Sequence, residues 1–161
     1  MENISIIAAV GKNGELGKNN NLIWHLKGDL PFFKKQTIGK PVVMGMNTFK
    51  SLPKLLPGRK HIVLTRKFVE LDPSVLVVHS MGEAMDYIKN YEHEVMIIGG
   101  AHVYSEFIDE ASKLYLTEVD AEEKTADCYF PEFDHSLYEK TIIDENKEGI
   151  PYQHVLYLKK K

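Results

Sequence analysis

Five short runs of apolar residues constrain the fold most, because they are apolar almost throughout instead of alternating with polar residues. Strands that are buried on both faces have this composition, and they occur in mainly parallel sheets. The runs span residues 4–10, 41–44, 61–65, 75–78 and 95–98. Helix-like stretches lie between them, over residues 29–37, 80–91 and 101–108, so the sequence predicts an α/β fold with right-handed crossovers.

The last third of the chain shows strand patterns without helices between them. Residues 113–120, 138–143 and 152–158 fit this description, and we expect them to add antiparallel strands at one edge of the sheet. The length of 161 residues suits one domain. We therefore predict a single α/β domain over residues 1–161, with about eight strands in a mainly parallel sheet and about four flanking helices.

The composition excludes several classes of protein. Cys128 is the single cysteine, which excludes an internal disulfide and a cysteine-based metal cluster. The seven histidines show no metal-ligand spacing, so we expect no metal. No apolar run reaches the ~20 residues that span a bilayer. Residues 1–3 lack the basic start of a secretory signal, so we expect a cytoplasmic protein that does not contact membranes.

The net charge of −3 hides an asymmetry between the two halves of the chain. Residues 1–80 carry 12 lysines and arginines against 5 acidic residues, whereas residues 81–161 carry 8 against 18. A basic half can bind nucleic acid or a smaller polyanion, and it can equally be a solvated surface. The basic residues are not interleaved with aromatic residues that could stack on bases, so we expect no nucleic-acid partner.

Three predicted strands end in residues suited to binding phosphate. In open α/β sheets, ligands bind beyond the carboxyl ends of the strands. Gly99-Gly100 precedes a helix, which fits either a phosphate contact or a tight turn. Gly45 is followed by Asn47 and Thr48, which could cap a helix or contact phosphate. Arg66 follows the third strand. It fits either a phosphate ligand or one member of a solvated Arg-Lys pair.

Asp29 is the fourth candidate. It opens a predicted helix, where aspartate is a common N-cap. Its neighbours Trp24, Leu30 and Phe33 are apolar, so it could instead be a lone carboxylate in an apolar pocket. Such a carboxylate would hold a cationic or amidine-like ligand by charge-assisted hydrogen bonds.

Short motifs in a fixed order extend over nearly the whole chain. They are Ala8-Ala9, Leu16-Gly17, Asn21-Leu22-x-Trp24, Asp29-Leu30-x-x-Phe33-Lys34, Pro41-Val42-Val43-Met44-Gly45-x-x-Thr48, Leu56-Pro57-Gly58-Arg59, Gly99-Gly100-x-x-x-Tyr104 and Leu114-Tyr115-Leu116-Thr117. In this order and spacing the sequence resembles bacterial dihydrofolate reductase. The resemblance favours a ligand role over the local alternatives for Asp29 and Arg66.

The resemblance implies NADPH-dependent reduction of 7,8-dihydrofolate to tetrahydrofolate, which supports one-carbon and thymidylate metabolism. Hydride would pass to pterin C6, and N5 would gain a proton from water. Asp29 would hydrogen-bond the pterin with support from Thr117, and the other implied catalytic residues are Leu22, Trp24 and Tyr104. The implied substrate-binding residues are Ile7, Asp29, Leu30, Phe33, Lys34, Leu52, Arg59, Ile98 and Thr117, with Arg59 at the carboxylate of the glutamate tail.

The resemblance also implies a set of residues for NADPH. They are Ala9, Leu16, Gly17, Asn20, Gly45, Met46, Asn47, Thr48, Leu64, Thr65, Arg66, His79, Ile98, Gly99, Gly100, Ala101, His102, Val103 and Tyr104. Thr65 and Arg66 would take the 2′-phosphate, and the peptide between the paired glycines would be cis. Residues 11–24 would form a mobile lid. The expected ligands are dihydrofolate and antifolate-type small molecules, and the expected state is a monomer.

Three departures from the family pattern bear on these expectations. Ile23 stands where a proline is common, and Met46 stands where an arginine often contacts cofactor phosphate. Ala126 replaces a usual glycine in a loop, residues 122–127, that is one residue longer and normally contacts the lid. Two other functions remain open: another pyridine-nucleotide reductase of the same fold, such as the pyrimidine reductase of riboflavin synthesis, or a non-catalytic nucleotide-binding module.

Overall fold

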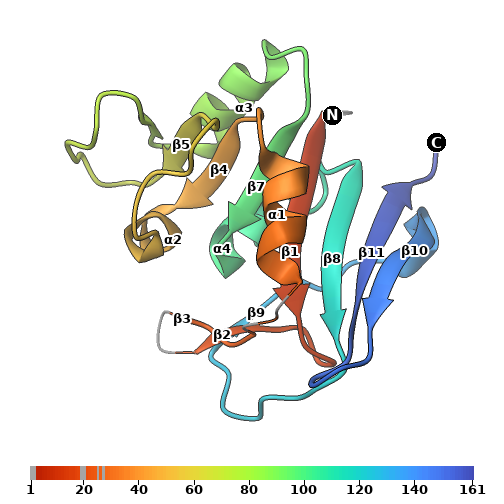
Figure 1. Ribbon diagram of the computed structural model, residues 1–161. Helices are drawn as coiled ribbons and strands as arrows, with labels where there is room; N and C mark the ends of the chain where they lie inside the picture. The colour runs from red at the N-terminus through yellow and green to blue at the C-terminus, as the bar shows by residue number, and fades with distance from the viewer. Residues whose placement is uncertain (1–2, 19–20, 25, 27) are drawn as a thin grey trace.

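A computed structural model describes residues 3–18, 21–24, 26 and 28–161, with Asn21 and Leu22 as backbone only. Its main feature is an eight-stranded sheet in the order β10-β11-β8-β1-β7-β4-β5-β6 (Figure 1). The strands are β1 (Ile4–Val10), β4 (Val42–Gly45), β5 (His61–Leu64), β6 (Leu76–Val78), β7 (Val95–Gly99), β8 (Lys113–Val119), β10 (Tyr138–Asn146) and β11 (Tyr152–Lys159). The predicted α/β fold with a mainly parallel sheet is confirmed.

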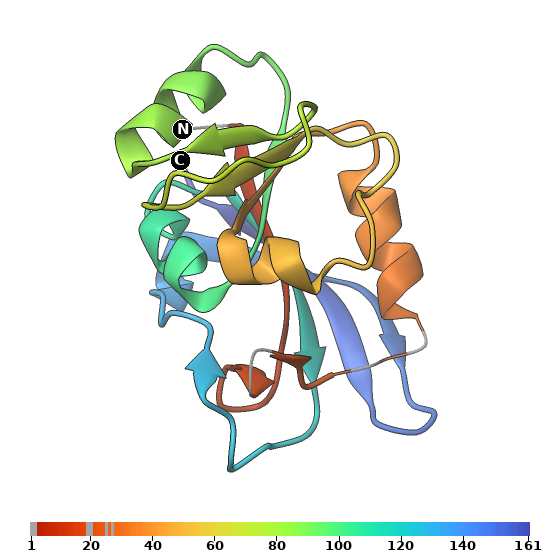
Figure 2. The same ribbon diagram turned by 90° about the vertical axis from the view of Figure 1, so that its left-hand side faces the viewer.

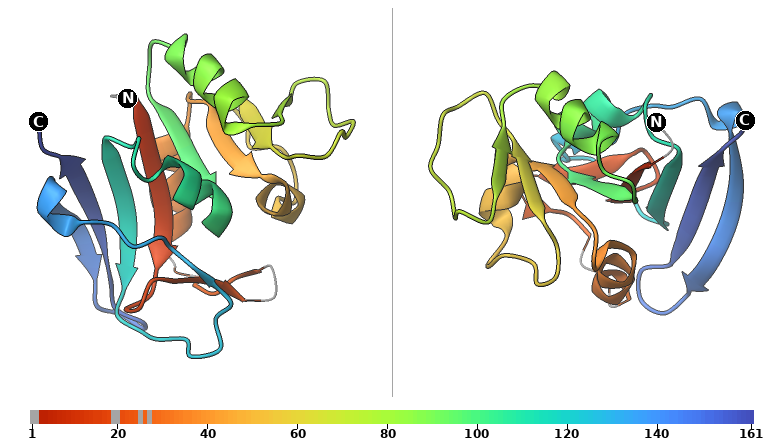
Figure 3. Two further views of the ribbon diagram at one scale, coloured as in Figure 1. Left: turned by 180° about the vertical axis from the view of Figure 1, so that it is seen from behind. Right: turned by 90° about the horizontal axis from the view of Figure 1, so that it is seen from above.

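The antiparallel pairs of the sheet lie at its C-terminal edge, as expected, where β11 is antiparallel to β8 and to β10. On its other side β8 runs parallel to β1. The physical reason for this parallel pair is the helix α4 (Ala101–Phe107), which carries the chain from β7 across to β8 and returns it in the same direction. Figure 3 shows β10 and β11 at one edge of the sheet and β5 and β6 at the other.

Helices cover both faces of the sheet, which explains why its central strands are apolar almost throughout. α1 (Asp29–Thr37) and the short α2 (Met46–Ser51) pack on one side, and α3 (Met81–Lys89) and α4 pack on the other (Figure 2). One apolar cluster contains Ile97, Ile88 and Phe107, and a second contains Met96 and Phe32. Neighbouring residues of β7 thus enter different clusters, as the alternation of side chains along a strand requires.

The predicted start of α3 is confirmed in its capping geometry. The hydroxyl of Ser80 accepts a hydrogen bond from the backbone N–H of Glu83 at 3.1 Å. The carboxylate of Glu83 accepts from the backbone N–H of His79 at 3.4 Å, one residue before the cap. A single-turn 3₁₀ helix, η1 (His135–Leu137), precedes β10. No helix in the described part of the chain is long and apolar enough to cross a membrane.

A second, three-stranded sheet lies at the carboxyl ends of β1 and β8 (Figure 1). Its order is β3 (Asn21–Leu22), β2 (Glu15–Lys18) and β9 (Cys128–Tyr129). The sequence did not predict these strands, because they are two to four residues long and carry no apolar run. Two of these strands, β2 and β3, belong to the segment expected to be a lid. The third, β9, pairs with β2 and so holds that segment against the chain near residue 128.

A buried carboxylate joins the lid segment to the loop that follows β8. The Glu15 residue is 1% exposed, and its carboxylate accepts hydrogen bonds from the backbone N–H groups of Asn13 at 2.7 Å and Glu123 at 2.6 Å. Gly17 adds a backbone bond, from Asp127 N–H to its carbonyl at 3.0 Å. Burial alone would raise the pKa of Glu15, but the backbone hydrogen bonds outweigh burial and lower it.

Replacing Phe107 with alanine should remove the largest fully buried side chain of the core. We expect a loss of about 3–5 kcal/mol in the free energy of unfolding, because the cavity would be only partly refilled. The measurement is urea unfolding of Phe107→Ala beside Phe68→Ala, whose side chain is 89% exposed and should cost no more than ~0.5 kcal/mol. Equal losses in the two variants would contradict this account of the core.

Replacing Glu15 with glutamine should destabilise the protein by ~1–3 kcal/mol at neutral pH, because one buried N–H loses its acceptor. The pKa of Glu15 is lowered in the folded state, so its contribution is complete above the unfolded value of about 4.3 and is lost as pH falls through the folded pKa. The gap between wild type and Glu15→Gln should therefore close in acid, as denaturant titrations from pH 7 to pH 3 would test. A gap that is independent of pH, like that of the control Glu92→Gln on the surface, would refute the role of Glu15.

Candidate active site

Two of the predicted phosphate-binding junctions lie side by side at the carboxyl edge of the sheet. β4 and β7 are neighbours, and their last residues are Gly45 and Gly99. A Cβ at Gly99 would lie 3.2 Å from Thr48 Oγ1, and a Cβ at Gly45 would lie 3.3 Å from Val103 Cγ2. The Gly99-Gly100 peptide is cis, as expected. The two junctions thus form one cradle, in which the backbone of Gly45 and Gly99 faces side chains near the starts of α4 and α2.

The local alternative for Asn47 and Thr48 is wrong, because neither residue caps α2. The N-cap is Gly45, and no side chain makes a capping hydrogen bond there. Asn47 is exposed, while Thr48 is half-buried against Gly99 and Gly100. Met46 is half-buried and packs on the second apolar cluster. The hydroxyl of Thr48 and the amide of Asn47 therefore remain available to a ligand in the cradle.

The end of β5 places the remaining phosphate candidates. Leu64 and Thr65 are half-buried, and Arg66 is exposed. The carbonyl of Thr65 accepts from Nδ1 of His79 at 3.0 Å, which joins β5 to the end of β6. Phe68, which sequence reasoning missed, is 89% exposed with its ring centroid 4.6 Å from that of His79. Its only sequence signal was a lone aromatic residue in a polar loop.

Two other candidates, Asp29 on α1 and Tyr104 on α4, lie near the centre of the sheet. Tyr104 is buried, and its hydroxyl lies 2.7 Å from the carbonyl oxygen of Ile7 and 2.9 Å from that of Ile98. Burial, and then the charge of Asp29, raises the pKa of Tyr104 far above its ordinary value. The Tyr104 hydroxyl is therefore a neutral link between β1 and β7. The expected catalytic role of Tyr104 stays a prediction.

Asp29 is the first residue of α1, and it does not cap the helix. The N-cap is Gly28, without a side-chain hydrogen bond. The Asp29 side chain is 24% exposed, and its Oδ1 accepts a hydrogen bond from Thr117 Oγ1 on β8 at 2.6 Å. The structure thus brings together the two residues that the resemblance paired. Thr117 holds one oxygen of the Asp29 carboxylate, and the side chain remains partly exposed, so Asp29 can accept hydrogen bonds from a ligand.

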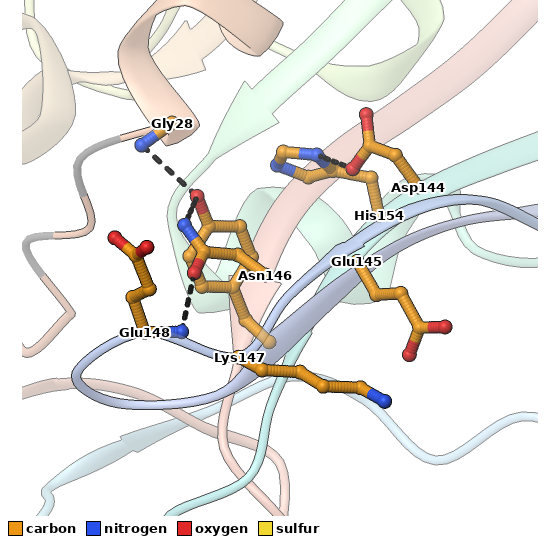
Figure 4. A pocket seen from close by; sticks show the side chains of 8 residues that line it. Gly28, Asp144, Glu145, Asn146, Lys147, Glu148 and His154 are labelled. Carbon is orange, nitrogen blue, oxygen red and sulfur yellow. Dashed lines mark hydrogen bonds and ion pairs between the residues drawn. The ribbon is translucent and has the colours of Figure 1, made fainter.

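Sequence reasoning missed two further residues, of which His154 contacts Asp29 and Asp144 contacts His154. Nε2 of His154 is 3.4 Å from Asp29 Oδ1, and Nδ1 of His154 is 2.6 Å from Asp144 Oδ1. Burial alone would lower the pKa of His154, but its hydrogen bonds to Asp29 and Asp144 and their charges outweigh burial and raise it. Figure 4 shows His154 and Asp144 at a pocket whose other lining residues are Gly28, Glu145, Asn146, Lys147, Glu148 and Tyr152. No local sequence signal marked this pair.

The apolar residues expected to bind substrate differ in their burial. Ile7, Phe33, Leu52 and Ile98 all belong to or pack on the second apolar cluster, with Phe32. Leu30 does not, because it is 78% exposed. Two residues along a helix turn the side chain by ~200°, so the burial of Phe32 faces Leu30 away from the sheet. The expected contact of Leu30 with substrate stays a prediction.

Arg59 sits at the far end of α1 from Asp29. Its Nη1 donates to Thr37 Oγ1 at 3.3 Å, and its Nε donates to the Pro57 carbonyl at 3.0 Å. Burial lowers the pKa of Arg59, and arginine stays charged across the working pH range. Lys34, between the two ends, is exposed. The helix thus separates a carboxylate at its start from a fixed guanidinium at its end.

The remaining candidates lie near the lid segment and α4. Trp24 is buried, donates from Nε1 to the Glu15 carbonyl at 3.0 Å, and packs with Val119 and Tyr152. Leu16 and Gly17 are buried on β2, and Ala9 is half-buried on β1. On α4, Ala101 is half-buried, Val103 is buried, and His102 is exposed with an ion pair to Glu106 at 3.4 Å. Asn20 and the side chain of Leu22 lie outside the described residues.

Comparison with known proteins agrees with the motifs. A family model described as dihydrofolate reductase matches residues 3–159. Dihydrofolate reductase of Buchnera aphidicola subsp. Baizongia pistaciae is 39% identical over 149 residues, which are 90% of each chain. The Bacillus subtilis enzyme of the same name is 37% identical over 161 residues, 98% of this chain and 95% of that one.

A solved structure gives the same result in three dimensions. It is dihydrofolate reductase from Enterococcus faecalis complexed with NADP(H) and RAB-propyl. It superposes with a TM-score of 0.89 at 33% identity and covers 98% of this chain and 96% of that chain. Among the described residues, no group of three His, Cys, Asp or Glu side chains could hold a metal ion. The motifs, the fold and the relatives agree, and the chain belongs to the dihydrofolate reductase family.

Proposed function

We propose that this protein reduces 7,8-dihydrofolate to 5,6,7,8-tetrahydrofolate with NADPH. The observation that carries the proposal is the half-open carboxylate of Asp29, held by Thr117 at the carboxyl edge of a sheet with the fold of the family. The protein would act as a cytoplasmic monomer of one domain and serve one-carbon and thymidylate metabolism. Antifolate-type small molecules would compete with its substrate.

The pterin ring would bind to Asp29. Among the described residues, Thr117 and His154 contact Asp29, and both do so at Oδ1, which would leave Oδ2 for the ligand. The amino group of the pterin and the neighbouring ring nitrogen present two donors to one carboxylate, a charge-assisted arrangement stronger than neutral hydrogen bonds. Phe33, Leu52 and Ile7 would cover the faces of the ring. Asp29 thereby orients the pterin and polarises it.

The length of α1 matches the length of the substrate. The helix has nine residues and a rise of 1.5 Å per residue, so its first residue, Asp29, and its last, Thr37, which contacts Arg59, are ~12 Å apart along its axis. Dihydrofolate carries a pterin at one end and a glutamate carboxylate at the other. Arg59, already fixed through Nε and Nη1, would clamp that carboxylate with less loss of side-chain entropy than a free arginine.

The cradle between β4 and β7 fits NADPH. Bare backbone at Gly45, Gly99 and Gly100, beside the hydroxyl of Thr48, lets a pyrophosphate approach to hydrogen-bond distance. Thr65 and Arg66 at the end of β5 would take the 2′-phosphate, and Ala9, Ile98 and Tyr104 would border the nicotinamide. When bound, NADPH supplies the hydride that is transferred to pterin C6.

The proton for N5 would come from a source other than the side chains placed around the pterin. The hydroxyl of Tyr104 lies against the carbonyls of Ile7 and Ile98, so its proton would stay in those hydrogen bonds, and burial, which raises its pKa, also opposes its loss. Asp29 binds the opposite side of the pterin in this arrangement, so water would deliver the proton. The lid strands β2 and β3, with Trp24 behind them, would control entry of that water.

Replacing Asp29 with asparagine should lower kcat/KM for dihydrofolate by about 10²-fold or more, because a neutral amide cannot make the charge-assisted pair. The loss should be greatest at neutral and higher pH. The assay is the fall in NADPH absorbance that depends on added dihydrofolate and is blocked by a diaminopyrimidine. NADPH binding, followed by fluorescence, should survive in Asp29→Asn, and Asp86→Asn on the surface of α3 serves as the matched control. Full activity of Asp29→Asn across the pH range would refute the assignment.

Replacing Arg66 with leucine should lower the preference for NADPH over NADH by about 10- to 100-fold, the range of one or two charged hydrogen bonds. Met46 makes this position more important, because no arginine follows Gly45. The measurement is the ratio of kcat/KM for the two cofactors in Arg66→Leu and in Lys67→Leu, an adjacent exposed cation. An unchanged ratio in Arg66→Leu, or an equal change in both variants, would show that Arg66 does not read the 2′-phosphate.

A further inference from the structure

Four residues form a straight row across the sheet beneath α1. Asp144 on β10 lies opposite His154 on β11, His154 lies opposite Thr117 on β8, and Thr117 lies opposite Ala9 on β1. Side chains directly opposite each other in paired strands project from the same face of the sheet. The row therefore runs from an exposed edge carboxylate to the position expected beside the nicotinamide, and Asp29 meets it from α1.

A β-bulge puts Asp144 into this row. Ile142 pairs with Val155, and the next pair is Asp144 with His154, so Ile143 is the extra residue. Without the extra residue, Ile143 would stand opposite His154, and Asp144 would point to the other face. Bulges redirect side chains in this way and are common beside active sites. The bulge gives His154 a carboxylate partner instead of an isoleucine.

His154 is buried between two carboxylates that accept hydrogen bonds when they are ionised. Its side chain is 4% exposed, with Asp144 at Nδ1 and Asp29 at Nε2. A neutral imidazole can donate from only one ring nitrogen, whereas an imidazolium donates from both. The ring also stacks on Phe32, with centroids 3.8 Å apart and planes 5° apart. The geometry therefore matches a charged, immobilised ring.

The groups around His154 come from every element packed against it. Asp29 and Phe32 come from α1, Thr117 from β8 and Asp144 from β10. Tyr152 on its own strand is 5.3 Å away, ring centre to ring centre, and its hydroxyl accepts from the N–H of Gly28 at 3.0 Å. The pocket beyond Asp144 adds Glu145, Lys147 and Glu148. Within the part of the chain that the structure describes, Asp29 and Asp144 are the charged groups in contact with the ring.

We propose that His154 is a positioning residue that, anchored by Asp144, holds the substrate-binding carboxylate of Asp29 and couples substrate turnover to the protonation state of its own ring. The proposal rests on the proposed function for its kinetic part. Protonated His154 and Thr117 together fix Oδ1 of Asp29, so that Oδ2 faces the pterin. When His154 loses its proton at high pH, its Nδ1–H stays with Asp144, and Asp29 loses one of its two donors.

The first test follows His154 itself, without any reaction. Proton NMR of selectively labelled histidine in the ligand-free protein gives the titration midpoint of the ring. Asp144→Asn keeps an acceptor but removes a charge, so the proton affinity of His154 should fall about tenfold. Asp29→Asn should lower it in the same direction, and Glu145→Gln, one residue along β10, should leave it unchanged. A midpoint that moves in neither Asp144→Asn nor Asp29→Asn would overturn the proposal.

The second test uses the pH profile of kcat/KM for dihydrofolate. His154→Phe keeps a flat ring against Phe32 but removes both hydrogen bonds. The ratio of wild type to His154→Phe should be about tenfold below the midpoint of His154 and should decline toward one above it. The Asp144→Asn profile should move to lower pH by the amount that NMR gives, and that of Glu145→Gln should not move. A ratio independent of pH would reduce His154 to packing and overturn the proposal.

The two tests separate this proposal from the proposed function. If wild type does not oxidise NADPH on addition of dihydrofolate, the proposed function fails. The NMR comparison would still decide whether His154 is held by Asp144 and Asp29. If wild type is active and the NMR midpoints stay fixed, the proposed function stands and the role of His154 fails.

Discussion

The hydrogen bond between Thr117 Oγ1 and Asp29 Oδ1 is the contact on which the rest of the site depends. It joins the first turn of α1 to the centre of β8, two elements that are 88 positions apart in the chain. A carboxylate at the start of a helix would ordinarily turn back to cap it. Here Gly28 takes the cap position, and Asp29 is free to face the sheet. Together with the packing of Phe32 on the sheet, this contact holds α1 in place, and Arg59 bonds to Thr37 at the other end of the helix.

Two carboxylates, Glu15 and Asp29, each join separate segments of this protein by hydrogen bonds, but they differ in burial. Glu15 is 1% exposed and is satisfied by backbone N–H groups, so it locks the lid segment to residues 121–127. Asp29 is partly exposed and keeps one oxygen for a ligand. A buried and fully satisfied carboxylate contributes to stability, whereas one with an open oxygen can bind. The difference in burial separates the structural role from the functional one.

The sequence predicted those parts of the structure that depend on local pattern. Residues 41–44 and 95–98 were predicted as buried strands because helices cover both faces of the sheet there, and the helix predicted over residues 80–91 is α3. The parallel pairing of β8 with β1 was not predicted, because it depends on the crossover through α4. The exposure of Leu30 was not predicted either, because it depends on which face of α1 packs on the sheet. His154 and Asp144 were missed because their contact depends on strand register and on a single extra residue, Ile143. For Asp29, local sequence favoured a cap, and only the resemblance pointed to a ligand role.

The central claim is that the carboxylate of Asp29 is the group that receives the pterin. The most direct measurement is calorimetric titration with a 2,4-diaminopyrimidine at a pH above the pKa of the free ligand, repeated in buffers of different ionisation enthalpy. Wild type should take up close to one proton on binding, because the ligand binds as a cation paired with Asp29. Asp29→Asn should bind far more weakly and take up none. Equal affinity and equal proton uptake in the two proteins would show that Asp29 does not receive the ring.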